Sequence, residues 1–250
     1  MIQAYPLSEG TFTIGHDKIF VPFDETKDVL NQRPIGSLLV EIQPFLIDNG
    51  TDLMILDTGL GFKNEQGVLQ IHQNIHDLGY SPDDVTKVLF SHLHKDHISG
   101  AVYKNENGVF MATFPNAEYC IYRPEAQYAL ATGAPSYETH YVEEVLKLEN
   151  IRWLDGQMGD IDGVVHYTHS GGHCPQHIVY LIESSNQRFF FGGDEAPQYK
   201  QIKTKYIAKY DYDGKRAMEL RNLYAQEGKM HDWNFLFYHD VKKPISKIDF

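Results

Sequence analysis

The chain has 250 residues, of which 42% are hydrophobic and 22% are charged, and its formal net charge is −12. This length is ample for a hydrophobic core, and no apolar run reaches the ~18 residues that a membrane span needs. An acidic chain binds the phosphates of nucleic acids poorly. We expect a single domain over residues 1–250 that is a monomer or homodimer. We also expect that it acts on a small molecule and binds neither nucleic acid nor membrane.

The N-terminus and the cysteine content indicate the cellular compartment. The N-terminus lacks a positive start and a long apolar stretch, so we expect no secretory signal. The two cysteines, Cys120 and Cys174, are too few for a disulfide framework, and this usage favours the cytoplasm. Two basic clusters, at 199–209 and 241–247, contain no binding motif, and we interpret both as solvated surface.

Strand-forming sequence comes early in the chain. The apolar runs 37–47 and 53–59 are separated by "DNGTD", a strong turn signal. Apolar side chains then recur with helical spacing over 67–79. Ser81, followed by a proline, is typical of the start of a second, short helix. The run 87–90 is expected to be a buried strand.

Strands and helices continue to alternate in the rest of the chain. Further strands are expected at 117–122, 151–154, 163–168, 177–183, 188–193 and 234–238. Helices are expected at 124–131 and 137–148, with a long helix within 211–227. Hairpin-like strand pairs occur beside strand–helix units, which favours two mixed sheets covered by helices.

Histidine and aspartate side chains follow several of these strands directly. They are His92, His94, Asp96 and His97 after the strand at 87–90; His169, His173 and His177 after 163–168; Asp194 after 188–193; and His239 and Asp240 after 234–238. Strand ends of one sheet lie side by side, so such residues converge in space. Imidazole and carboxylate are ligands for zinc and other borderline divalent metals.

The spacing within "SHLHKDH" suggests two metals rather than one. His92 and His94 are two residues apart and can face the same point. Asp96 and His97 lie further round the turn and can face a second point. Elsewhere, His72 and His76 have the i, i+4 spacing of a zinc pair, but no third ligand is near in sequence. A solvated helix face is the simpler interpretation there.

These motifs resemble the metallo-β-lactamase superfamily over nearly the whole chain. "SHLHKDHISG" is similar to the H-x-H-x-D-H signature, and "LMILDTG", "SGGHCPQHIVYLIE", "FFFGGD" and "NFLFYHD" are similar to the other ordered motifs. Length and motif order are most similar to those of the small hydrolases related to quorum-quenching lactonases. The resemblance implies an αββα sandwich of two mixed β-sheets flanked by helices, which agrees with the pattern of expected elements.

The resemblance also implies a centre of two divalent metal ions, with zinc as first choice and manganese, iron or cobalt as alternatives. It implies seven ligands: His92, His94 and His173 for one metal, Asp96, His97 and His239 for the second, and Asp194 as the bridge. His173 matches the motif histidine because a Gly-Gly turn precedes it and a proline follows two residues later.

Several neighbours of the ligands have other interpretations. Asp57 in "LDTG" is either a carboxylate that accepts a hydrogen bond from a ligating histidine or a turn former. His177 is interpreted as structural, and His169 is left open. Cys174 adjoins a proposed ligand and is interpreted as a small, partly buried thiol outside the metal shell. Asp240 is interpreted as an exposed turn residue.

The sequence departs from the lactonase pattern at three positions. Gln176 replaces the glycine before the last motif histidine, and Lys95 adds a cation within the ligand loop. Lactonases of this kind carry a substrate-contacting tyrosine three residues after the bridging aspartate, where this chain has Pro197. The nearest tyrosine, Tyr199, is our candidate for the substrate contact. These departures concern lactone specificity and leave the hydrolase core intact.

We therefore predict a dinuclear metal-dependent hydrolase in which a hydroxide held between the metals attacks a small ester, lactone or related substrate. Asp96, a ligand with an oxygen to spare, is expected to pass a proton to the leaving group. The alternatives are a glyoxalase-II-like thioesterase and a phosphoester or organophosphate hydrolase. From another class, the alternative is a non-catalytic metal-binding or sensor protein on the same scaffold.

Overall fold

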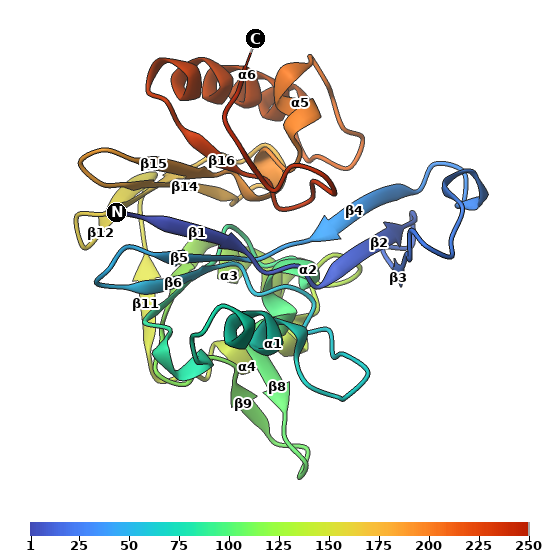
Figure 1. The fold of residues 1–250 in the computed structure, drawn as a ribbon, viewed down its shortest axis with the longest axis vertical. Coiled ribbons are helices and arrows are strands. Elements are labelled where there is room, and N and C mark those ends of the chain that lie inside the picture. Colours follow the sequence, from blue (N-terminus) through green and yellow to red (C-terminus); the bar gives the residue numbers. More distant parts are fainter. Residues whose placement is uncertain (250) are drawn as a thin grey trace.

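Two six-stranded sheets form the centre of the molecule in a computed structural model that describes residues 1–249 (Figure 1). The first sheet has the order β1-β5-β6-β7-β10-β11. Its strands are β1 (Gln3–Pro6), β5 (Phe45–Asp48), β6 (Leu53–Leu56), β7 (Lys87–Leu89), β10 (Glu118–Tyr122) and β11 (Ile151–Leu154). The pairs β6–β7, β7–β10 and β10–β11 are parallel, whereas β1–β5 and β5–β6 are antiparallel, so this sheet is mixed.

The second sheet has the order β12-β13-β14-β15-β16-β17. Its strands are β12 (Met158–Ile161), β13 (Val165–His169), β14 (Ile178–Glu183), β15 (Arg188–Phe191), β16 (Asn234–Leu236) and β17 (Ile245–Ser246). Only β15 and β16 pair in parallel, and the other neighbours are antiparallel. A parallel pair needs a crossover connection, and the chain supplies it between β15 and β16 with α5 (Tyr199–Lys203) and α6 (Gly214–Met230).

Helices cover the outer face of each sheet. Buried side chains of α1 (Gln70–Asp77), α3 (Arg123–Thr132) and α4 (Thr139–Val145) pack in one apolar cluster with the first sheet. On the other side, Tyr224 and Ala225 of α6 pack against Phe190 and Phe235 of the second sheet. Between the sheets lies a third cluster, in which the rings of Phe45 and Phe191 meet edge to face at 6.0 Å. The predicted αββα sandwich is confirmed.

A three-stranded arm stands beside the sandwich and was not predicted as a separate unit. It consists of β2 (Gly10–Ile14), β3 (Phe20–Pro22) and β4 (Leu38–Ile42), with a short 3₁₀ turn, η1 (Leu30–Gln32), between β3 and β4 (Figure 1). The apolar run 37–47 was expected to be continuous strand. Instead it breaks after Ile42, because Pro44 has no N–H for a ladder, and its two halves enter different sheets.

The remaining elements are short. They are 3₁₀ turns η2 (Pro82–Asp84), η3 (Ser99–Ala101) and η4 (Gly193–Glu195), the helix α2 (Lys95–Ile98), and the hairpin of β8 (Val102–Lys104) and β9 (Phe110–Ala112). At η2, the Ser81 hydroxyl accepts from the N–H of Asp83, while the Asp84 carboxylate accepts from the Ser81 N–H, which confirms the predicted cap.

Among the described residues no helix has the length and apolar character to cross a membrane.

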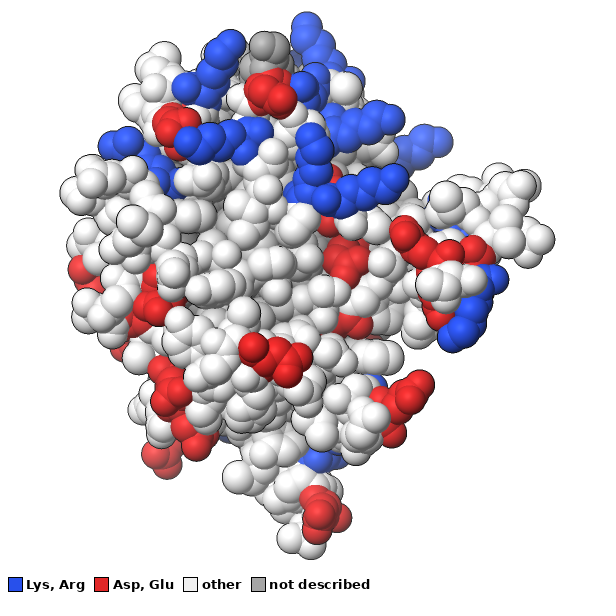
Figure 2. Space-filling view, viewed as in Figure 1, with Lys and Arg blue, Asp and Glu red and all other residues white. Residues whose placement is uncertain are grey.

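Charge is distributed unevenly over the surface. Figure 2 shows lysine and arginine side chains gathered over the end of the molecule that carries α5 and α6, and mostly aspartate and glutamate over the rest of this face. The predicted basic clusters, 199–209 and 241–247, both belong to the C-terminal part of the chain, which contains α5 and α6. The net charge of −12 is therefore a poor guide to any one part of the surface.

Candidate metal centre

Two loops of the first sheet meet directly beneath the H-x-H-x-D-H run. Thr58 donates to the carbonyl of His97 from its N–H (2.7 Å) and from its hydroxyl (2.9 Å). A Cβ on Gly100 would lie 1.9 Å from the Thr58 carbonyl oxygen, so only glycine permits this approach. Asp57 precedes this contact with a φ of 53°, and its carboxylate is fully buried.

The first predicted ligand set converges at the end of the strands. His92 Nε2 lies 2.9 Å from His94 Nδ1, which lies 3.2 Å from His173 Nε2. His173 Nε2 lies 3.2 Å from Asp194 Oδ2. One donor atom from each of these four residues lies within 4.8 Å of the others. The structure therefore brings together loops after β7, β13 and β15, as the strand-end argument predicted.

The second predicted set lies beside the first and shares Asp194 with it. His97 Nε2 is 3.6 Å from Asp96 Oδ2 and 3.4 Å from Asp194 Oδ1. His239 Nε2 is 3.5 Å from Asp96 Oδ2 and 2.9 Å from Asp194 Oδ1. Asp194 thus presents one oxygen to each set, the arrangement that a bridging ligand requires.

Hydrogen bonds at the far ring nitrogens orient the histidines. His97 Nδ1 lies 2.7 Å from Asp57 Oδ2, and His239 Nδ1 lies 2.7 Å from the carbonyl oxygen of Glu41. A neutral imidazole that donates from Nδ1 keeps a lone pair on Nε2. In this tautomer both Nε2 lone pairs face the space beside the carboxylates of Asp96 and Asp194. Such oriented lone pairs are what a metal centre needs.

Ser91 connects His92 to Asp57 and so orients its ring. Ser91 Oγ donates to Asp57 Oδ2 at 2.7 Å, so its oxygen can accept from His92 Nδ1 at 3.1 Å. Asp57 Oδ1 also accepts from the Ser91 N–H at 2.7 Å. Asp57 also forms a possible donor group with His92 and His97, but Ser91 and His97 already engage both of its oxygens, so the carboxylate is placed to orient the proposed ligands. Of its two interpretations, the supporting role fits these contacts.

The donor atoms themselves are the strongest sign that a cation fits. His97 Nε2 is buried and has no hydrogen-bond partner among the described residues, and the buried Asp194 Oδ1 faces the ring nitrogens of His97 and His239. Burial lowers the pKa of His97, but the charges of Asp96, Asp194 and Asp57 outweigh burial and hold that pKa well above its usual value. Burial raises the pKa of Asp194, but neighbouring histidines, led by His239, hold it well below its usual value. The carboxylates therefore favour positive charge at this point, which a divalent metal would supply.

Two histidines of the other ligand set, His92 and His94, have a different electrostatic environment. Burial, followed by the charges of neighbouring histidines, holds the pKa of His92 well below its usual value. Burial and the nearby His173 do the same for the pKa of His94. Both imidazoles are therefore neutral near pH 7, the state in which they bind metal.

A buried aspartate behind His173 was not found from the sequence. Asp211 Oδ1 lies 3.0 Å from His173 Nδ1, and its other oxygen lies 3.6 Å from the Arg221 guanidinium in α6. Arg221 in turn donates to the carbonyls of Glu195 (3.1 Å) and Tyr206 (2.8 Å). Asp211 is 38 residues from His173 in sequence. No motif marks it, and only the placement of α6 brings it into contact.

Other histidines lie outside the two sets. His177 Nδ1 is 2.9 Å from the hydroxyl of Ser170, and its Nε2 accepts from the N–H of Asp194 at 3.2 Å. His177 thus positions the backbone of the bridging residue, in keeping with its structural interpretation. His169 Nε2 lies 2.8 Å from the Pro175 carbonyl, on the loop and away from the donor atoms.

The helical pair His72 and His76 does not form a site. His72 Nε2 lies 3.0 Å from the carbonyl oxygen of Thr113, which is hydrogen-bond distance. Neither histidine belongs to a group of donor atoms that could hold a metal within residues 1–249. His72 thus packs against the loop before β10, whereas His76 is exposed.

Cys174 lies next to a proposed ligand but points elsewhere. Its side chain is 3% exposed, and its sulfur is 3.7 and 3.8 Å from the two oxygens of Glu125. Burial, followed by the charge of Glu125, raises the pKa of the thiol well above its usual value. Glu125 also accepts from the N–H of Leu93 at 3.0 Å. The thiol therefore stays protonated inside a hydrogen-bonded cluster.

We expect Cys174→Ser to leave metal content and catalytic rate nearly unchanged, because serine keeps a small donor beside Glu125. Elemental analysis and steady-state rates test this expectation. Cys120→Ser, at the other buried cysteine, serves as a matched control for the cost of placing a hydroxyl in the interior. Loss of one metal equivalent in Cys174→Ser alone would show that the sulfur belongs to the metal shell.

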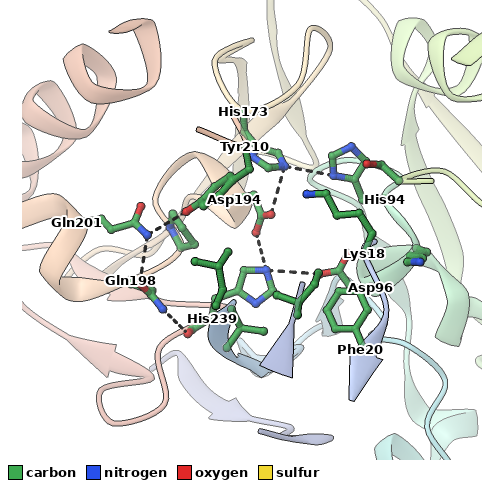
Figure 3. A pocket seen from close by; sticks show the side chains of 16 residues that line it. Lys18, Phe20, His94, Asp96, His173, Asp194, Gln198, Gln201, Tyr210 and His239 are labelled. Atoms are coloured by element: carbon green, nitrogen blue, oxygen red, sulfur yellow. Dashed lines mark hydrogen bonds and ion pairs between the residues drawn. The ribbon is translucent and has the colours of Figure 1, made fainter. Parts of the chain in front are cut away.

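A pocket opens directly over the two ligand sets. Its floor includes His94, Asp96, His173, Asp194 and His239 (Figure 3). One wall comes from the arm, with apolar side chains of β2, β3 and β4. The opposite wall comes from the segment after η4, including Pro197, Gln198, Gln201 and Tyr210. The proposed metal ligands are therefore accessible to a small molecule from one side.

The tyrosine that lines this pocket is Tyr210, and Tyr199, the tyrosine proposed from the sequence, is not among the lining residues. Tyr210 accepts a hydrogen bond from Gln201 Nε2 at 3.0 Å, and its ring lies 6.0 Å from that of His173. The side chain of Tyr199 instead contacts Phe237 and hydrogen-bonds to Asp249. Tyr199 is the first residue of α5, and its side chain points away from the pocket.

Comparison with known proteins identifies the family. The family model described as the metallo-beta-lactamase superfamily matches residues 41–230. The chain therefore belongs to the metallo-beta-lactamase superfamily, and the resemblance drawn from its motifs is confirmed.

Several curated relatives are N-acyl homoserine lactonases by name. The chain is 31% identical over 195 residues to lactonase AiiA of Bacillus thuringiensis subsp. kurstaki, a match covering 73% of this chain and 70% of that one. It is 30% identical over 120 residues to lactonase AttM of Agrobacterium fabrum, covering 44% and 41%. It is 31% identical over 172 residues to a lactonase of a Bacillus species, covering 64% and 62%. The chain thus matches less than two thirds of the length of the last two relatives.

Solved structures share the fold at low identity. A probable metal-dependent hydrolase from Staphylococcus aureus superposes with a TM-score of 0.79 at 20% identity, covering 98% of this chain and 92% of that one. AidC, described as a dizinc quorum-quenching lactonase, superposes with a TM-score of 0.74 at 18% identity, covering 99% and 91%. These superpositions show that the chain shares the fold of these structures.

Proposed function

We propose that this protein is a dinuclear metal-dependent hydrolase that acts on a small ester or lactone. The observation that carries the proposal is the convergence of two histidine-rich donor sets on the shared carboxylate of Asp194, at the floor of an accessible pocket. The names of the lactonase relatives support the choice of bond. An intact donor set argues against a non-catalytic sensor on the same scaffold.

Seven side chains would hold the metals, divided as the motifs implied: His92, His94 and His173 on one side, Asp96, His97 and His239 on the other, and Asp194 between them. When bound, two such metals supply a water whose pKa falls toward ~7 and polarise the electrophilic oxygen of the substrate. Nitrogen and oxygen donors suit zinc, our first choice, but also manganese, iron or cobalt.

Asp96 is the residue that we propose for proton transfer. Its Oδ2 faces His97 and His239, at 3.6 and 3.5 Å. Its backbone carbonyl accepts from the Tyr238 hydroxyl at 2.6 Å, which fixes the start of α2. The side chain lines the pocket, so Oδ1 can receive a proton and deliver it to a leaving group.

The proposal predicts close to two metals per chain and hydrolysis that depends on them. Elemental analysis after metal-supplemented expression should give about two equivalents. A panel of aryl esters, lactones, thioesters and phosphotriesters should show turnover in the ester or lactone class. Chelation should abolish this turnover, and reloading with zinc should restore it. One metal or fewer after supplementation would count against the dinuclear centre, and turnover of thioesters or phosphotriesters alone would count against the proposed bond.

A further inference from the structure

We infer that the substrate of this pocket carries an anionic group attached to an apolar chain, and this inference rests on the proposed hydrolase function. The overall charge of −12 argues for a neutral substrate. The pocket argues otherwise, because two lysines, Lys18 and Lys95, line it together with the proposed metal ligands. The local arrangement around these two side chains carries the inference.

Lys18 is held over the pocket by the turn between β2 and β3. Its N–H donates to the Gly15 carbonyl at 3.2 Å, and its φ is 59°, a conformation that costs energy for a residue with a side chain. The ammonium nitrogen lies 6.0 Å from the centre of the Tyr210 ring. Figure 3 shows the side chain directed toward the imidazoles of His94 and His173. A strained turn thus places a cation beside the proposed reaction centre.

Lys95 approaches the same space from the other side. It is the first residue of α2, between the proposed ligands His94 and Asp96, so the ligand loop fixes its backbone. Its ammonium nitrogen lies 5.9 Å from the centre of the Phe20 ring in the arm. The two lysines therefore come from two different elements and flank one pocket.

Neither cation is neutralised by the protein. Within residues 1–249, the ammonium groups of Lys18 and Lys95 contact aromatic rings, and neither forms an ion pair. The carboxylates in the pocket, Asp96 and Asp194, face histidine nitrogens instead. Cation–π contacts orient an ammonium group but leave its charge available. Two uncompensated cations in one pocket are a site for an anion.

The rest of the pocket is suited to an apolar chain. Ile14, Leu38 and Val40 of the arm line it beside Phe20. A second hollow continues outward past Ile14, Lys18, Leu38 and Tyr210, and it ends among Tyr206, Ile207 and Lys209. An apolar chain can follow this path while its charged group stays near Lys18. The geometry therefore favours an amphiphilic, anionic ester over a small neutral one.

The test uses two esters that differ only in charge. Mono-4-nitrophenyl adipate and 4-nitrophenyl hexanoate have the same leaving group and the same six-carbon acyl chain, which ends in a carboxylate or a methyl group. Metal-loaded protein should prefer the adipate ester in kcat/KM by about tenfold to a hundredfold, the usual effect of a hydrogen bond to a charged group. The preference should reside in KM and weaken with added salt.

Variants assign the preference to the pocket. Lys18→Met should lose most of the preference, and Lys18→Arg should retain it. Lys147→Met removes one positive charge from an exposed site just after α4. It should leave kcat/KM for both esters unchanged. Equal kcat/KM for the two esters in the wild-type protein, or an unchanged preference in Lys18→Met, would overturn the inference and leave the hydrolase function standing.

A binding measurement separates this inference from the proposed function. If neither ester is hydrolysed, the proposed function fails, and calorimetric titration of metal-loaded protein with adipate and hexanoate then decides the inference. Tighter binding of adipate, lost in Lys18→Met, would support an anion site. Equal affinities would refute it.

Discussion

Replacing Asp194 with asparagine is expected to reduce the metal content from about two equivalents to one or fewer and to lower kcat/KM by about 10³-fold. The carboxylate presents one oxygen to each donor set, with 3.2 Å to His173 Nε2 and 2.9 Å to His239 Nε2. Asparagine keeps the shape but has only one oxygen and no charge. Loss of a metal removes several kcal/mol of transition-state stabilisation, which corresponds to a loss of this size. Elemental analysis and steady-state rates on one sample test it.

Asp155→Asn is the matched control for this experiment. Asp155 is a surface aspartate paired with Arg123 at 2.9 Å, and its side chain is 60% exposed. This variant should keep both metals and full activity, because an exposed ion pair contributes little. Two metals and an unchanged rate in Asp194→Asn would refute the bridging role.

The second large effect is expected at Asp96. Asp96→Asn keeps one oxygen donor beside His97 and His239 but removes the charge and the proton acceptor. At least one metal should remain. Because a placed side chain that transfers a proton contributes ~10² to 10⁴-fold, kcat should fall by about that factor for alkyl esters.

Leaving groups separate the two roles of Asp96. A nitrophenolate leaves without a proton, so the fall in kcat should be smaller for a nitrophenyl ester than for an alkyl ester. Rates for both esters, measured with the metal content of the same preparation, decide between the roles. An equal fall with both metals retained would mean that Asp96 only positions a metal, and no fall at all would remove it from the mechanism.

The structure brings the predicted donor residues together because they are tied to strand ends. Each proposed ligand follows an apolar run that has to be a strand, and neighbouring strand ends meet at one edge of the sheets. Local signals also located the η2 cap at Ser81 and the long helix α6, which begins at Gly214, close to its expected start. These features depend on a few adjacent residues, so a single sequence contains the information.

The supporting contacts were missed because they depend on tertiary structure. Asp211 reaches His173 only through the packing of α6, and Lys18 reaches the pocket only through the arm. Glu9 is a further example: it is 4% exposed and accepts from the N–H groups of Leu60 (2.6 Å) and Phe62 (3.0 Å). Burial raises the pKa of this carboxyl to about 8, despite these hydrogen bonds. Nothing in "SEGTF" indicates a buried acid.

Tyr199 illustrates the limit of positional reasoning. Its distance from Asp194 in sequence is close to that of the family tyrosine, but the intervening chain forms η4 and then begins α5 at this residue. The direction of a side chain depends on such local backbone geometry, which a count of residues does not capture. Tyr210, eleven residues further along, enters the pocket because the chain turns back before α6.

The position of the donor sets between the two sheets has a consequence for folding. His92, His94, Asp96 and His97 belong to the half of the chain that builds the first sheet, whereas His173, Asp194 and His239 belong to the half that builds the second. A cation held by both halves is a cross-link that exists only when the halves are assembled. Its binding free energy therefore adds to the stability of the docked sandwich, by the same linkage that makes any native-state ligand stabilising. The concentration of available metal would then affect the stability of the folded chain as well as its catalytic rate.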